Sequence, residues 1–129
     1  MFDLEWYQSL GKPALTPPPE AFQTVWPVLY ILMAVSFYFY LKQTPKIQRP
    51  LGIIFFCLQL FLNFLWSPVF FGMQRIGSAL LVLSLLIVTV ACTVWIFNKT
   101  SRLAAGLLLP YFVWILFAWY LNFEIWRLN

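Results

Sequence analysis

The chain has 129 residues, of which 63% are hydrophobic and only 9% are charged, and its mean hydropathy is +0.84. Because a soluble domain carries roughly 25% charged residues, this composition excludes a soluble enzyme, a disordered tail and a secreted disulfide scaffold. The net charge of +4 comes from eight Lys and Arg residues scattered over the connecting segments. No basic patch of the kind that binds nucleic acid is visible, so nucleic acid is not expected as a partner.

The first 20 residues differ in kind from the rest of the chain. Gly11, Pro13 and the run Pro17-Pro18-Pro19 prevent one long helix, because proline removes a hydrogen-bond donor and fixes its own dihedral angle. Trp6-Tyr7 carries rings of the kind that settle at a membrane–water boundary. These features favour an ordered interfacial loop across one end of a helix bundle, with a flexible tail as the alternative.

The remaining sequence is divided by its charged residues into long apolar stretches. Uncharged segments lie at 21–41, 50–74, 76–98 and 103–123. A bilayer core needs roughly 20 helical residues to cross it, and lipid offers no partners to an unpaired backbone. We therefore predict an all-α membrane protein with a single domain over residues 1–129 and transmembrane helices at about 21–41, 50–71, 77–97 and 103–123.

The connections between these helices predict an orientation. Four crossings place both chain ends and the turn at 72–75 on one side, together with Lys12, Arg75 and Arg127. The other side holds five cations: Lys42, Lys46, Arg49, Lys99 and Arg102. Since cytoplasmic loops carry an excess of Lys and Arg, this second side is predicted to be cytoplasmic.

Three of the predicted helices carry a stripe of polar, aromatic or small side chains at helical spacing. The stripes consist of Trp26, Tyr30, Met33 and Phe37; Gln59, Asn63 and Ser67, with Trp66 and Phe70 beside them; and Pro110, Trp114, Ala118 and Asn122. Two interpretations remain open, because polar side chains in membranes often hold helices together, whereas converging aromatic stripes can line a ligand cavity.

Residue types that are missing narrow the chemistry. No Asp, Glu, Lys or Arg lies within any predicted span, which argues against proton-coupled drug export through a buried carboxylate. The chain has no His, so no metal site is expected, and axial ligation of haem iron by Tyr30 or Tyr111 is conceivable but not expected. An aromatic cavity that suits a flat, apolar molecule remains, with no required cofactor.

Several motifs resemble the tryptophan-rich sensory protein and translocator protein family, once called peripheral-type benzodiazepine receptors. The similarity runs from residue 6 to the end of the chain with its spacing preserved. It is carried by Trp6-Tyr7, Lys12-Pro13, Pro17-Pro18, Val25-Trp26, Leu29-Tyr30, Asn63, Trp66-Ser67-Pro68-Val69-Phe70-Phe71-Gly72, Pro110-Tyr111, Trp114, Phe117-Ala118 and Leu121-Asn122.

The resemblance implies a membrane receptor or sensor that binds porphyrins, including haem, and other hydrophobic molecules between its helices, linked to tetrapyrrole handling or stress responses. It implies a pocket made by Tyr7, Pro18, Trp26, Asn63, Trp66, Phe70, Trp114 and Ala118, to which the stripes add Tyr30 and Asn122. It also implies either a bacterial envelope or the mitochondrial outer membrane as the location.

Two other functions remain open under this resemblance. Some family members break down porphyrin in the light, and the two tryptophans tied to that activity correspond to Trp26 and Trp114. The third function is passive movement of hydrophobic ligands or sterols. Phe123 stands where the sterol-recognition pattern has Tyr, which weakens the expectation of sterol binding.

The family bundle has five transmembrane helices, and the helix that precedes Trp6-Tyr7 in the family has no counterpart in this sequence. A four-helix version would lack one wall of the bundle. We therefore expect either membrane lipid or a second copy of the chain, in a homodimer, to cover the open surface.

Overall fold

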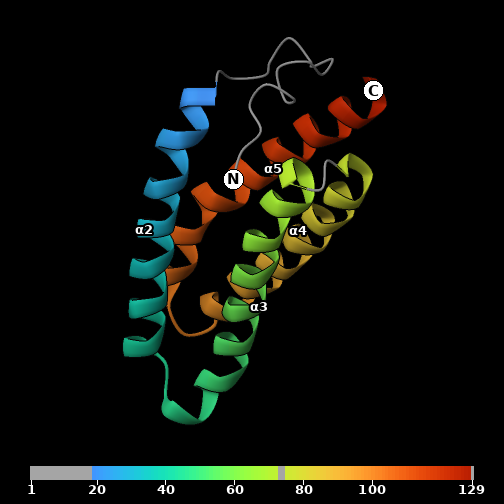
Figure 1. The fold of residues 1–129 in the computed structure, drawn as a ribbon. Helices are drawn as coiled ribbons and strands as arrows, with labels where there is room; N and C mark the ends of the chain where they lie inside the picture. Colours follow the sequence, from blue (N-terminus) through green and yellow to red (C-terminus); the bar gives the residue numbers. More distant parts are fainter. Residues whose placement is uncertain (1–18, 73–74, 129) are drawn as a thin grey trace.

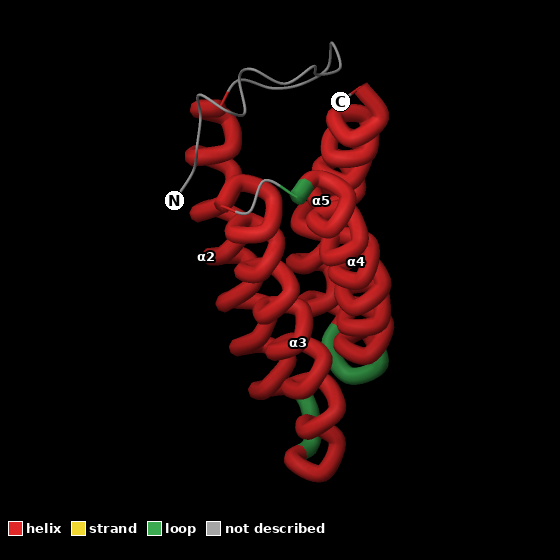
Figure 2. Tube along the Cα trace, turned by 45° about the vertical axis from the view of Figure 1, so that its right-hand side comes forward, coloured by secondary structure: helices red, strands yellow, loops and turns green. Residues whose placement is uncertain are grey.

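The computed structural model describes residues 19–72 and 75–128. It contains the helices α2 (Pro19–Gln43), α3 (Arg49–Ser67), α4 (Ile76–Asn98) and α5 (Arg102–Leu128), with a 3-10 turn η1 (Lys46–Gln48) and a π-helical turn η2 (Pro68–Gly72). Figure 2 shows only helices and loops in this part of the chain. All four α-helices are long and apolar enough to cross a membrane, which confirms the predicted fold class.

The predicted interfacial loop falls almost wholly outside the described residues. Tyr7 and Pro18, which the sequence places in a ligand-binding lid, lie there too. The one part that can be compared is its end, because α2 already begins at Pro19, two residues before the predicted boundary. Proline suits the first position of a helix, where its missing N–H would have no partner in any case.

The observed helices are longer than the uncharged segments at two of the four positions, α2 and α5, and α4 coincides with its segment. α5 continues past residue 123 to Leu128, and Glu124 and Arg127 form an ion pair one turn apart on its exposed end. A charge ends an apolar stretch but does not end a helix, so the charge positions underestimate helix length. α3 differs in the other direction, since it ends at Ser67 and gives way to the π-helical turn that starts at Pro68.

The helices pack in an order that differs from their order in the chain. Close backbone approaches join α2 to α5, α5 to α4 and α4 to α3. Figure 1 shows the start of α2 and the end of α5 at one end of the bundle, with the α2–α3 and α4–α5 connections toward the other. This is the arrangement that an even number of crossings predicts.

The bundle buries a narrow core and exposes apolar surface outward. Its largest fully buried side chains include Met33, Tyr40, Phe97 and Tyr111. Outward-facing hydrophobic residues are abundant, and Ile31 on α2 and Val113 on α5 are each 63% exposed. Such a surface fits acyl chains rather than water. The outward face of α2 is part of this apolar surface. That lipid or a second copy of the chain covers this face stays a prediction.

Candidate ligand-binding site

The aromatic stripes of α2 and α5 meet inside the bundle. Trp26 and Tyr30 are one turn apart on α2, and their rings stack with centroids 5.8 Å apart. The Trp114 ring of α5 stands edge-on to Trp26 at 6.3 Å, with an interplanar angle of 87°. All three side chains are half-buried. We call Trp26, Tyr30 and Trp114 the aromatic site.

A chain of hydrogen bonds runs from the aromatic site into the core. The Tyr30 hydroxyl donates to Asn63 Oδ1 at 2.5 Å, and Asn63 Nδ2 donates to the Tyr111 hydroxyl at 2.9 Å. The Tyr111 hydroxyl in turn donates to Gln59 Oε1 at 2.8 Å. Gln59 Nε2 lies 3.7 Å from Met33 Sδ, a weak sulfur acceptor. We call this chain the polar relay.

The polar relay links three helices whose backbones do not all approach closely. Tyr30 comes from α2, Asn63 from α3 and Tyr111 from α5. Each side chain of the polar relay donates a hydrogen bond to the next one, so these buried polar groups have protein partners and need no water. The relay therefore fixes the rotation of α2 and α3 about their axes, which in turn holds the Tyr30 ring beside Trp26.

Three of the predicted site residues, Trp66, Phe70 and Asn122, form a second group of contacts, which we call the second tie. Trp66 Nε1 donates to Asn122 Oδ1 at 3.0 Å, and Asn122 Nδ2 donates to the Ile76 carbonyl at 3.1 Å. The Trp66 ring stacks on Phe70 at 5.3 Å. Phe70 itself is buried in a small cluster with Val69, Ala79 and Ile125, where α3 passes into η2. Asn122 thus has two protein partners and joins α3, α4 and α5.

Ala118 lies between these two groups along α5. It is buried in the main core, one turn beyond Trp114 and one turn before Asn122. A methyl side chain at this point leaves more room beside Trp114 than a larger residue would. Trp66 is half-buried and packs against both the main core and the small cluster.

Sequence reasoning placed Gln59 in the α3 stripe and named Tyr111 only as an unusual haem ligand, but it assigned neither of them, nor Phe64, to the ligand-binding site. Tyr111 lies one turn before Trp114 on α5, and Gln59 one turn before Asn63 on α3, so helical spacing was the available signal. Phe64 packs on the Tyr30 ring with centroids 5.6 Å apart. Phe64 lies on the exposed side of α3, so it does not belong to the inward-facing stripe of that helix.

Among the described residues, the segments that form the site are electrically neutral. Almost every side chain named above comes from three segments, 21–41, 50–74 and 103–123. These segments contain no Asp, Glu, Lys or Arg. The exceptions are Ile76, Ala79 and Ile125, which are uncharged as well. Over residues 19–72 and 75–128, no three His, Cys, Asp or Glu residues come close enough to hold a metal ion. The arrangement can therefore hold an uncharged ring system by stacking and can offer amide and hydroxyl groups to its edge.

Comparisons with known proteins identify the family of the chain. Residues 2–127 match the TspO/MBR family. The chain is 39% identical over 125 residues to the tryptophan-rich sensory protein of Cereibacter sphaeroides, covering 97% of this chain and 77% of that protein. It is also 39% identical over 130 residues to the human translocator protein, covering 98% of this chain and 76% of that one. Protein CrtK of Rhodobacter capsulatus is 38% identical over 125 residues, with 96% and 78% covered. The chain therefore belongs to the TspO/MBR family, and its four long apolar helices make it an integral, multi-pass membrane protein.

Proposed function

We propose that this protein is a membrane receptor or sensor that binds porphyrins and other flat hydrophobic molecules at the aromatic site. The observation that supports this most strongly is the approach of Trp26 and Trp114, which are far apart in sequence and come from different helices. Two indoles set edge to face form a corner, and a flat macrocycle can stack on one ring while its edge meets the other.

The polar relay supports the same proposal. Tyr30 and Asn63 stand at the edge of the aromatic site, and their hydrogen bonds are made only to other neutral groups. A ligand that carries a carbonyl, carboxyl or ring N–H can exchange partners with them at little cost. Relatives named as sensory protein and translocator protein are consistent with a chain that responds to, or moves, a small molecule.

A binding titration tests the proposal. Protoporphyrin added to the full chain in mild detergent is expected to quench tryptophan fluorescence to saturation. Replacing both indoles by aliphatic side chains, Trp26→Leu with Trp114→Leu, is expected to weaken binding about tenfold, because roughly 0.5–1.5 kcal/mol of aromatic stacking is lost at each ring.

The matched control is Trp126→Leu, which removes an indole that is 51% exposed near the end of α5. It should lower the total fluorescence but leave the dissociation constant unchanged. Because the double variant has lost two emitters, its affinity is read from porphyrin absorbance as well. Equal affinity in the double variant and the wild type would exclude the aromatic site as the place of binding.

The edge-to-face pair of Trp26 and Trp114 also supports a second candidate, light- and oxygen-dependent porphyrin breakdown. Illuminating the same bound sample in air separates the two functions. Loss of the porphyrin Soret band that requires both light and Trp26 favours an enzyme, whereas a stable band favours a receptor. Flux of intact porphyrin into liposomes that contain the protein would instead favour passive translocation.

A further inference from the structure

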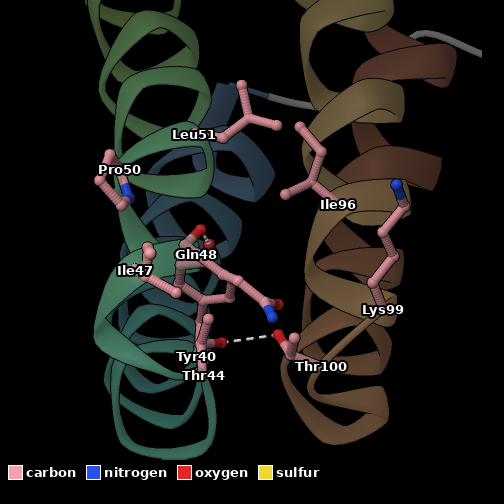
Figure 3. Close-up of a pocket in the computed structure, with 9 residues that line it drawn as sticks. All are labelled: Tyr40, Thr44, Ile47, Gln48, Pro50, Leu51, Ile96, Lys99 and Thr100. Carbon is pink, nitrogen blue, oxygen red and sulfur yellow. Dashed lines mark hydrogen bonds between the residues drawn. The ribbon is translucent and has the colours of Figure 1, made fainter.

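A pocket of about 420 Å³ lies at the end of the bundle opposite the start of α2 and the end of α5. It is formed between the α2–α3 connection and the last turn of α4. Its apolar lining includes Ile47, Leu51 and Ile96, and its polar lining includes Thr44, Lys99 and Thr100. Figure 3 shows Leu51 of α3 and Ile96 of α4 pointing toward one another across the pocket. None of these residues belongs to the aromatic site or the polar relay.

The end of the bundle that holds this pocket is strongly positive. Five cations lie in or beside the two connections: Lys42, Lys46, Arg49, Lys99 and Arg102. No Asp or Glu occurs anywhere between Glu20 and Glu124, so the sequence offers these cations no carboxylate at this end. Arg49 Nε donates a hydrogen bond to the Thr44 carbonyl at 2.9 Å. Lys99 is an exposed lining residue of the pocket, and Figure 3 shows its ammonium at the level of Ile96, away from the hydrogen bond between Thr44 and Thr100.

The pocket changes from apolar to polar along the helix axes, which is the direction across a membrane. Lys99 Nζ lies 3.8 Å from the centroid of the Trp95 ring, which is 63% exposed on the outward face of α4. An exposed tryptophan with a lysine over it is typical of the level at which headgroups meet acyl chains. Leu51 and Ile96 lie on the side of the pocket toward the middle of the helices, and the hydroxyls of Thr44 and Thr100 lie on the side of the connections.

We propose that this pocket binds an anionic glycerophospholipid. The phosphodiester would lie against Lys99, whose side chain would turn from Trp95 toward the pocket, and the first part of an acyl chain would follow Leu51 and Ile96 between α3 and α4. The phosphate group alone could come from a lipid or from a soluble anion. The apolar half of the pocket, and its position beside Trp95, favour the lipid.

The walls of the pocket are held in place without a ligand. The hydroxyls of Thr44 and Thr100 share a hydrogen bond of 2.6 Å, drawn as a dashed line in Figure 3, which joins the two connections. Ser101 adds a second bond between the same connections by donating to the Gln43 side chain. The Tyr40 ring beneath them stacks on Phe97 at 4.0 Å. A site that is already formed loses little freedom when a ligand binds.

Native mass spectrometry of the full chain in detergent, titrated with phosphatidylglycerol or phosphatidylcholine, tests the proposal. Wild type is expected to retain phosphatidylglycerol at concentrations where phosphatidylcholine is lost. Lys99→Gln is expected to weaken phosphatidylglycerol binding about fivefold, the effect of one cation beside an anionic headgroup. Leu51→Trp keeps every charge and fills the apolar half, so it is expected to weaken binding as well.

The matched control is Arg102→Gln, which removes the same charge from an exposed residue outside the pocket lining. It should change the affinity by less than about twofold. An equal loss in the Lys99 and Arg102 variants would mean general attraction to the positive end and would overturn the proposal. Equal retention of the two lipids, or displacement of the lipid by inorganic phosphate, would overturn it too. Unchanged thermal unfolding in each variant confirms that the pocket, and not the fold, was altered.

Discussion

Replacing Gly52 by alanine is expected to lower the free energy of unfolding by about 1–3 kcal/mol, the usual cost of adding a carbon to a filled core. A Cβ at this position would lie 2.2 Å from both the Cζ atom and the hydroxyl oxygen of Tyr40, far inside van der Waals contact. The ring has little freedom to move away, since it is stacked on Phe97 and its hydroxyl donates to the carbonyls of Gln48 and Arg49. Glycine is therefore required here by the close approach of α2 to the start of α3.

Gly106→Ala provides the matched control, because a Cβ at Gly106 would have no atom within 4 Å. Alanine is the better helix former by about 1 kcal/mol, so this variant should unfold at the same temperature as wild type or slightly above it. The measurement is thermal unfolding in detergent, followed by circular dichroism. A double variant, Gly52→Ala with Tyr40→Leu, should recover part of the loss, since it removes the ring that the new carbon meets. A Gly52→Ala protein as stable as wild type would show that Tyr40 is not held in place as described.

The positions of the membrane spans could be predicted because charge and length alone determine them. Lys42, Arg49, Arg75, Lys99 and Arg102 mark the ends of the apolar stretches, and each lies within three residues of an observed helix end. The ends of α3 and α5 could not be predicted from charge. α3 gives way to a π-helical turn at Pro68, and α5 continues through Glu124 and Arg127, and neither feature coincides with the end of an uncharged stretch.

The site was predictable in part, for a related reason. Helical spacing places Trp26 and Tyr30 on one face, and Trp114 on one face of another helix, but it does not say which helices are neighbours. The same stripe on α5 sends Trp114 toward α2 and Asn122 toward Trp66 and the start of α4. Tyr111 lies in an apolar run, and its role depends on Asn63 and Gln59 arriving from α3. Such pairings depend on how the helices are rotated against one another, which a single sequence does not record.

Replacing Asn63 by leucine is expected to lower the free energy of unfolding by about 1–3 kcal/mol, the cost of leaving buried polar groups without partners. The amide of Asn63 accepts from Tyr30 and donates to Tyr111, so the change breaks the polar relay in two places. The Tyr111 hydroxyl keeps Gln59 as its acceptor, whereas the described contacts leave the Tyr30 hydroxyl no other partner than Asn63. Hydrogen bonds between membrane helices average about 0.6 kcal/mol each, so two lost bonds and one orphaned hydroxyl account for the expected range.

A double-mutant cycle with Tyr30→Phe separates the polar relay from simple loss of packing. In the wild-type background Tyr30→Phe should destabilise the protein, because Asn63 Oδ1 loses its donor. In the Asn63→Leu background the same change should cost nothing or stabilise, since it removes the orphaned hydroxyl. Thr93→Val is the control, because the buried Thr93 hydroxyl donates only to the Thr89 carbonyl of its own helix and joins no two helices. Equal costs for Tyr30→Phe in both backgrounds, measured by unfolding in mixed detergent micelles, would mean that Tyr30 and Asn63 act independently and that the relay does not hold α2 against α3.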